Sequence, residues 1–278
     1  MANTQIQTTV LRTTNQFLTG MLEKEVQALP KGFNTLRFKQ NVLSVLNSVD
    51  ITNMKGQEFN LAKCIMKGAY LDLDFANNEC YVITYDGTPK FMTDYKGETK
   101  LVRKFSAKPI KDIYAKLVRY GDEFEEGVDH GKPYINFKPK AFNNDDIIGV
   151  FAVVYYEDGA MEYETMSKED VEYIRDNFSK KSKKTGKFSD AWVKSFGEMA
   201  KKTVLRRLCK HINIDFDNIP QKNAWDEGSD MEFESQEPKE AATEKSDLEK
   251  ELESNGDIVD QTNFVDTPFE EVNQNEDN

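Results

Sequence analysis

Clusters of Lys and Arg on two predicted helices are the side chains in this sequence that are best suited to binding chemistry. On the first helix, Lys96, Lys100 and Lys104 follow one another at steps of four residues, and Arg103 lies beside them. At 100° per residue, these four side chains fall within roughly 100° of arc on one helix face. Cations at this spacing can follow the phosphates of a nucleic acid, and the ring of neighbouring Tyr95 can stack on an unpaired base. We therefore interpret this face as a nucleic-acid contact rather than as an ordinary solvated surface.

A second basic segment covers residues 180–211, which hold 11 Lys and Arg against two acidic residues. Its periodicity predicts a long helix from about residue 190 to residue 211, with an apolar stripe that faces the core. Arg207 falls inside the apolar arc, so it either extends its guanidinium to water or pairs with a carboxylate. A basic edge runs parallel to the stripe and consists of Lys202, Arg206 and Lys210.

Motifs for covalent catalysis are missing from the sequence. It contains no GxxxxGK[ST] nucleotide-binding loop, no GxGxxG, no GxSxG and no HExxH. Two acidic pairs, Asp72 with Asp74 and Asp145 with Asp146, could hold Mg²⁺ in a nuclease, but Asp is common in turns for its own reasons. We therefore expect no catalytic residue and no metal ligand, and the sequence favours a binding protein over an enzyme.

Charge is segregated along the chain, although the 278 residues together carry a formal net charge of −12. Residues 224–278 hold 19 Asp and Glu against three Lys, whereas residues 1–223 carry a net charge of +4. Such asymmetry between regions indicates a protein that works on nucleic-acid or membrane surfaces. The longest apolar run, at 147–156, is too short to cross a membrane, and the N-terminus lacks a secretory core. Three well-separated cysteines indicate a reducing compartment.

The spacing of apolar residues predicts an α+β fold, with a mostly antiparallel central sheet and flanking helices that form a basic groove. Asp86-Gly87 predicts the turn of a hairpin, and Ser167 predicts the N-cap of a helix. Residues 1–14 are polar and are expected to be irregular. The predicted helices cover 15–29, 35–47, 60–71, 94–105, 167–178 and 190–211, and the predicted strands cover 81–85, 90–93, 110–120, 133–138, 147–156 and 161–166.

Two blocks of sequence carry a family resemblance. The first block holds Leu71-Asp72-Leu73, Tyr81-Val82-Ile83-Thr84-Tyr85-Asp86-Gly87, Lys90-Phe91, Asp94-Tyr95-Lys96-Gly97 and Leu101, and the second holds Trp192 and Met199-Ala200-Lys201-Lys202-Thr203-Val204-Leu205-Arg206-Arg207-Leu208. The order and separation of these blocks resemble those of the RecT family of phage single-strand annealing proteins over roughly residues 58–215. The chain departs from the family pattern at Asp94, where the family usually has Gly, and at Lys104-Phe105-Ser106, where it usually has Arg, a small residue and Gly.

The resemblance implies single-stranded DNA binding without ATP, and annealing of complementary strands in phage-type homologous recombination by an oligomeric ring or filament. An assembly that repeats a basic surface neutralises the repulsion between two phosphate backbones. Pairing and stacking then supply about 1.4 kcal/mol per base-pair step, so no nucleotide hydrolysis is required. Two alternatives stay open: a passive single-strand DNA-binding protein, which slows pairing, and a metal-dependent nuclease, which cleaves DNA once Mg²⁺ is added.

On this interpretation the chain has three parts. Residues 1–30 form an N-terminal helical segment available for subunit contacts, residues 31–223 form the DNA-binding annealing core, and residues 224–278 form a disordered acidic tail. The DNA-binding residues that the resemblance implies are Tyr95, Lys96, Lys104, Lys202, Thr203 and Arg206, and geometry and charge add Lys100, Arg103, Arg207 and Lys210.

Partners and location are also implied by the resemblance. The partners are single-stranded DNA and annealed duplex, further copies of the chain, a phage exonuclease and the single-strand-binding protein of the host, with no membrane. No cofactor is expected to be required, and Mg²⁺ is expected at most to modulate DNA binding. The expected location is the cytoplasm of a bacterial host cell.

Overall fold

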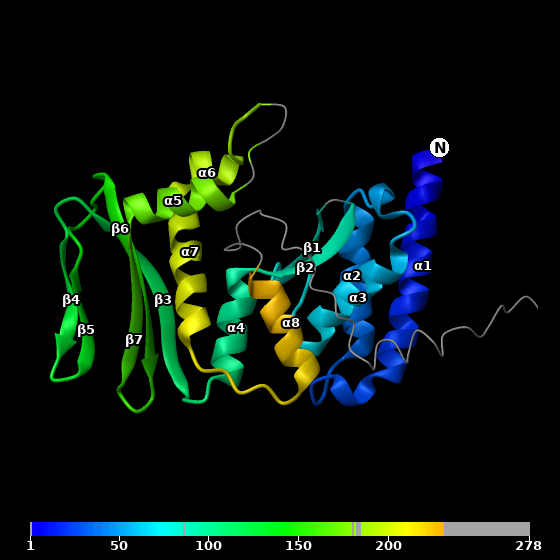
Figure 1. Cartoon of the computed structure of the whole chain (residues 1–278), viewed down its shortest axis with the longest axis horizontal. Helices are drawn as coiled ribbons and strands as arrows, with labels where there is room; N and C mark the ends of the chain where they lie inside the picture. Colours follow the sequence, from blue (N-terminus) through cyan, green and yellow to red (C-terminus); the bar gives the residue numbers. More distant parts are fainter. Residues whose placement is uncertain (1, 86, 180, 182–184, 231–278) are drawn as a thin grey trace, which may run out of the picture. The chain divides into compact units, whose positions relative to one another are not determined.

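The chain has an α+β architecture in which helices cover antiparallel sheets (Figure 1). The computed structural model describes residues 2–85, 87–179, 181 and 185–230. The sequence predicts one central, mostly antiparallel sheet. The described strands are antiparallel, but they form three separate sheets. Within those described ranges, no helix is both long enough and apolar enough to pass through a bilayer.

Three N-terminal helices pack on one another through apolar stripes. The first helix begins at Ala2 rather than near residue 15, because Val10, Thr14, Leu18 and Leu22 form one buried stripe at four-residue steps. The polar threonines of this segment therefore lie in a helix whose inward positions are apolar or small. The helices are α1 (Ala2–Lys24), α2 (Thr35–Ser48) and α3 (Glu58–Tyr70), with short 3-10 turns η1 (Val26–Ala28) and η2 (Thr52–Met54) between them.

The predicted hairpin is confirmed by the pairing of β1 (Cys80–Tyr85) with β2 (Thr88–Thr93). Its turn contains Gly87 in the left-handed region at φ 80°, whereas Asp86 lies outside the described residues. Helix α4 (Tyr95–Phe105) follows at once, and the side chain of Asp94 caps it by accepting a hydrogen bond from the Lys96 amide. Gly97 is required here, because a Cβ at this position would lie 2.1 Å from the Glu79 carbonyl oxygen.

A three-stranded sheet in the order β3-β6-β7 forms the second half of the described fold. Helix α7 (Phe196–His211) packs on one face of this sheet, against Val150, Ala152 and Val154 of β6. The other face carries Phe151 and Val153 and is covered in part by a separate hairpin, whose first strand the sequence did not predict. The strands are β3 (Ile110–Arg119), β6 (Ile147–Tyr156) and β7 (Met161–Ser167), and the hairpin consists of β4 (Glu123–Asp129) and β5 (Lys132–Lys138).

Four helices follow the sheet. Ser167 caps the first of them, as predicted, in a reciprocal capping box with Asp170. The long helix expected from residue 190 is interrupted at Ser195, so that Gly197 can approach the sheet: a Cβ there would lie 2.7 Å from Leu117 Cδ1. The helices are α5 (Lys168–Phe178), α6 (Asp190–Lys194), α7 (Phe196–His211) and α8 (Ile219–Asp230).

Helix α8 lies where the acidic tail was expected to begin. Residue 224 falls inside this helix, and Ala224 and Trp225 are buried at 1% and 8% exposure. Helix α8 packs on α3 and β2, so the tail proposed for 224–278 cannot begin before Asp230. By contacts, the described residues belong to one compact unit, and residues 231–278 lie outside the described residues.

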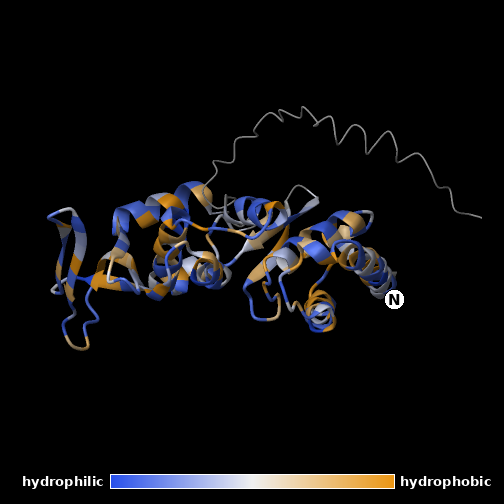
Figure 2. Cartoon of the chain, turned by 90° about the horizontal axis from the view of Figure 1, so that it is seen from below, coloured by the Kyte–Doolittle hydropathy of each residue, from blue (hydrophilic) through white to orange (hydrophobic). Residues whose placement is uncertain are grey.

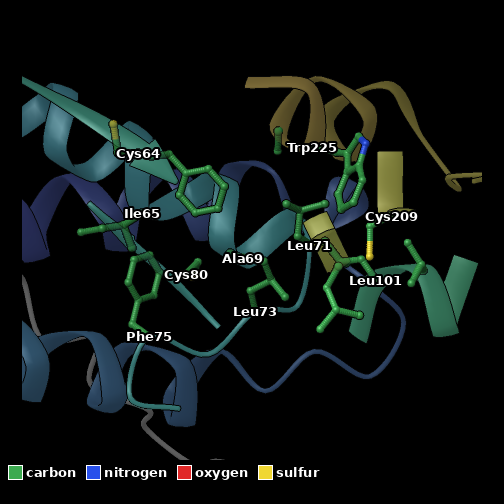
Figure 3. Close-up of a cluster of buried hydrophobic side chains, with 14 of the residues drawn as sticks. Cys64, Ile65, Ala69, Leu71, Leu73, Phe75, Cys80, Leu101, Cys209 and Trp225 are labelled. Carbon is green, nitrogen blue, oxygen red and sulfur yellow. The ribbon is translucent and has the colours of Figure 1, made fainter. Parts of the chain in front are cut away.

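One large core connects the N-terminal helices with α4, α7 and α8. Figure 3 shows Leu71, Leu101, Cys209 and Trp225 lying together, although they come from four distant parts of the sequence. Figure 2 shows polar residues on the outward surfaces of the helices and strands, with apolar residues on the surfaces that face their neighbours. All three cysteines are free and buried in this core.

Candidate nucleic-acid interface

The two cationic helices of the sequence analysis, α4 and α7, lie side by side. A buried ion pair joins them: Arg206 Nη2 lies 3.0 Å from Glu98 Oε1, and the two side chains are only 4% and 0% exposed. Thr93 Oγ1 lies 2.8 Å from the same Glu98 oxygen and 3.2 Å from the carbonyl oxygen of Gly228. The pair therefore fixes α4, α7, β2 and α8 relative to one another.

Arg206 and Thr203 are thus placed inside the fold rather than on its surface. The Thr203 hydroxyl donates to the Met199 carbonyl oxygen at 2.9 Å, a bond within its own helix. Thr203 is 7% exposed and Arg206 is 3% exposed. In this conformation both side chains position the helix, so direct DNA contact at either residue stays a prediction that requires α4 and α7 to separate.

Tyr95 and Lys202 mark the point where the N-terminal end of α4 meets the surface of α7. Lys202 Nζ lies 5.1 Å from the centroid of the Tyr95 ring and 4.0 Å from Asp94 Oδ2. Lys96 is exposed beside them, and within the described part of the chain it has no carboxylate at ion-pair distance. An aromatic ring and two accessible ammonium groups therefore share one small surface.

Lys100 and Lys104, which continue the face of α4, are paired with carboxylates from the loop that follows α3. Lys100 Nζ lies 2.8 Å from Glu79 Oε2 and 2.6 Å from the carbonyl oxygen of Asp72. Lys104 Nζ lies 3.3 Å from Asp72 Oδ2. The Lys100 and Lys104 side chains are 37% and 39% exposed, and their partners Glu79 and Asp72 are 15% and 44% exposed. A surface pair such as Lys104–Asp72 contributes only about 0–1 kcal/mol, so its carboxylate holds the ammonium group weakly.

The arginines at the edges of the surface are paired in the same way. Arg103 Nη2 lies 2.9 Å from Asp112 Oδ1 on β3. Arg207 Nε lies 2.9 Å from Glu164 Oε1 on β7, so of the two alternatives for this residue the structure shows the carboxylate partner. Lys210 is exposed one turn further along α7. The structure thus places Lys202 beside Tyr95, pairs Lys100 and Lys104 with the loop that follows α3, and pairs Arg103 and Arg207 with β3 and β7.

Sequence comparison bears directly on this region. The sequence profile of the RecT family matches residues 36–242, about three quarters of the chain. The chain belongs to the RecT family. Protein RecT of Escherichia coli strain K12 is 32% identical over 122 residues, which cover 43% of this chain and 41% of that protein. The match to this relative therefore spans less than half of its length, whereas the RecT family profile includes both α4 and α7.

Three of the four aspartates considered for a metal site have side-chain partners within the fold of this RecT family member. Asp72 forms an ion pair with the Lys104 ammonium group, and Asp74 Oδ2 accepts a hydrogen bond from Asn41 Nδ2 at 2.8 Å. Asp145 lies 3.6 Å from Lys140 Nζ. No group of three His, Cys, Asp or Glu side chains suited to a metal ion occurs among the residues that the structure describes.

The cysteine thiols are also unsuited to nucleophilic chemistry. Burial raises the pKa of Cys80 and of Cys209, and it is the main cause of the raised pKa of Cys64. A thiol with a raised pKa stays protonated near neutral pH, and the thiolate is the reactive form. These cysteines therefore act as small apolar side chains of the core.

Proposed function

We propose that this chain binds single-stranded DNA and anneals complementary strands without ATP, as an oligomer, in homologous recombination. The observation that carries the proposal is the meeting of α4 and α7 at Tyr95 and Lys202, which places an ammonium group against an aromatic ring in a member of the RecT family. The phosphates would follow the lysines, and an unpaired base would stack on the ring.

The carboxylates around these lysines suit a surface that must take up and release DNA. Ion pairs with Glu79 and Asp72 already restrict the side chains of Lys100 and Lys104, so less side-chain freedom is lost when a phosphate replaces these carboxylates. Because each exposed pair is weak, the exchange of carboxylate for phosphate is nearly balanced, and its outcome depends on salt. A strand held in this way can leave once it has formed a duplex.

Annealing needs two strands close together with their bases accessible. Cations repeated along an assembly of subunits reduce the repulsion between the two backbones. Base pairing and stacking then supply about 1.4 kcal/mol per step, which replaces the need for ATP. A basic groove between the helices and the sheet, and a ring or filament as the assembled form, are parts of this proposal.

The test is a fluorescence assay of annealing between two complementary oligonucleotides, without ATP and with or without Mg²⁺. We expect the full chain to accelerate duplex formation, and Lys96→Ala/Lys202→Ala to lose most of the acceleration while remaining folded. The matched control is Lys138→Ala, because Lys138 is 78% exposed on β5 and lies away from α4 and α7. Slower duplex formation than without protein would identify a passive binder, and cleaved strands would identify a nuclease.

Partners follow from the same proposal. A recombination system supplies single-stranded DNA through an exonuclease and covers it with a single-strand-binding protein, and both are proposed partners of this chain in a bacterial cytoplasm. No cofactor is required in this scheme, because phosphate binding and base pairing supply the free energy.

A further inference from the structure

Phe142 is the most unusual surface residue in the described part of the chain. Its side chain is 98% exposed, and its backbone lies in the left-handed region at φ 53°. A bulky residue in this region is uncommon and is strained. Full exposure of the ring means that no packing within the fold offsets this strain.

Hydrogen bonds around Asp122 hold the Phe142 loop in place. Asn143 Nδ2 donates to Asp122 Oδ1 at 2.8 Å and to the carbonyl oxygen of Tyr120 at 3.0 Å. The Lys140 amide donates to the same Asp122 oxygen at 2.9 Å. The ring is therefore presented on a fixed loop, which reduces the entropy lost when it enters a partner.

Two further apolar side chains extend this surface. Tyr120 is 71% exposed and follows the end of β3, and Ile148 is 48% exposed at the start of β6, so both flank the chain segment that contains Phe142. Together the three side chains define what we call the Phe142 edge. Aromatic anchors with a polar rim are typical of the centre of protein–protein interfaces.

A second exposed aromatic surface lies on the N-terminal helices. Phe17 of α1 and Phe59 of α3 are 41% and 46% exposed, and their rings meet edge to face with centroids 5.4 Å apart. Lys63 Nζ lies 4.8 Å from the centroid of the Phe59 ring. We call this pair the α1–α3 face. Helices α1 and α3 contact each other, and the β3-β6-β7 sheet is contacted by α7 instead (Figure 1), so the two surfaces belong to different parts of the fold.

The segments that contain the two surfaces have opposite net charge. Residues 2–70, which contain the α1–α3 face, hold eight Lys and Arg against four Asp and Glu, a net charge of +4. Residues 119–148, which contain the Phe142 edge, hold four Lys and Arg against seven Asp and Glu, a net charge of −3. Surfaces of opposite charge attract during encounter and exclude contacts between like surfaces.

We propose that the Phe142 edge of one subunit docks on the α1–α3 face of a second copy of this chain. This inference rests on the oligomer in the proposed function and names its interface. A contact between two different surfaces is heterologous. A subunit that docks through its Phe142 edge still has its α1–α3 face available for a third copy, so the assembly extends into a ring or a filament. The strain at Phe142 is then explained, because the ring is buried only in the assembly.

The experiment is chemical cross-linking of the full chain through engineered cysteines, because the three native cysteines are buried. The cysteines are placed beside the anchors, at the exposed residues Lys63 and Asn144, so that both aromatic surfaces are kept. Lys63→Cys/Asn144→Cys is treated with a short bis-maleimide, with and without single-stranded DNA, and resolved on a denaturing gel. We expect a ladder of covalent dimers, trimers and larger species. The matched control is Tyr173→Cys/Asn144→Cys, since Tyr173 is 64% exposed on α5, outside both surfaces, and it should give no ladder.

A second variant removes the anchor without disturbing the fold. Phe142→Gly deletes an exposed ring and suits the left-handed backbone, so thermal stability should be unchanged while the sedimenting species shifts to the monomer. An assembly that survives Phe142→Gly, or a ladder that is absent or equally strong in the control pair, would overturn this interface. The annealing rate of the wild-type chain is measured separately, so failure of the proposed function would be distinguished from failure of the interface.

Discussion

Arg206→Ala removes one partner of the buried ion pair between α4 and α7 and leaves Glu98 without it. Because both side chains are at most 4% exposed, water cannot take the place of the lost guanidinium. Breaking a buried pair in this way costs about 3–5 kcal/mol of the free energy of unfolding. Loss of an exposed pair costs only about 0–1 kcal/mol. Arg103→Ala, which loses the half-exposed pair with Asp112, is therefore the matched control.

Urea unfolding followed by tryptophan fluorescence measures the difference. Trp225 lies on α8, which touches the same site through Gly228, and it reports on this part of the core. With a slope of about 1–3 kcal/mol per molar urea, a loss of 3 kcal/mol lowers the midpoint by at least about 1 M. Arg103→Ala should shift the midpoint much less.

A double replacement separates charge from packing. Glu98→Leu/Arg206→Met replaces the pair with apolar side chains of similar length, and such replacements often restore or increase stability. We expect the double variant to unfold at a higher urea concentration than Arg206→Ala. The reasoning would be refuted if Arg206→Ala lost less than about 1 kcal/mol, since that is the range of an exposed pair.

Three further predictions follow from the described contacts. A chain that ends at residue 235 should keep the melting temperature of the full chain, whereas one that ends at residue 223 should lose several kcal/mol in calorimetry, because the buried Trp225 is removed. The native chain should react with a thiol reagent at pH 8 far more slowly than the unfolded chain, which exposes all three cysteines; equal rates would contradict their burial and raised pKa values. The hydrogen bond from Asn143 is the main cause of the lowered pKa of Asp122, so Asn143→Ala should raise this pKa in an NMR titration. Because the pKa of Asp122 is lower in the folded chain than in the unfolded chain, ionised Asp122 stabilises the fold above about pH 4, and this stabilisation is lost as the pH falls through the folded pKa. An Asp122 titration that is unchanged in Asn143→Ala would contradict the role of this hydrogen bond.

Most elements of the fold could be predicted because their apolar residues recur at a clear period. Two elements could not. Strand β4 carries four acidic residues among seven, and its Gly127 lies under the ring of Tyr134, so the alternation of apolar residues is weak. Helix α8 contains Gly228, where a Cβ would lie 2.9 Å from the Phe91 ring. A helix that depends on such a close tertiary contact has little periodicity of its own.

The candidate site, like the fold, could be predicted from the sequence only in part. The lysines of α4 and α7 could be predicted because their spacing on each helix is local, and the structure places Lys202 beside Tyr95, the sequence neighbour of Lys96. The carboxylate partners of the α7 arginines could not be predicted, because Glu98 and Glu164 meet Arg206 and Arg207 only through the tertiary fold. Arg206 is the clearest case: its place on a basic edge indicated a surface residue, and the helix packing turns it inward.

The salt dependence of single-stranded DNA binding tests most directly the claim that α4 and α7 present the phosphate-binding lysines. The logarithm of the affinity falls with the logarithm of salt concentration by about 0.7 for each phosphate contact to a single strand. Lys96→Ala/Lys202→Ala should therefore lower the steepness of this line by about 1.4, while Lys138→Ala leaves it unchanged. A double variant that binds with the same affinity and the same slope as the wild-type chain would contradict the account.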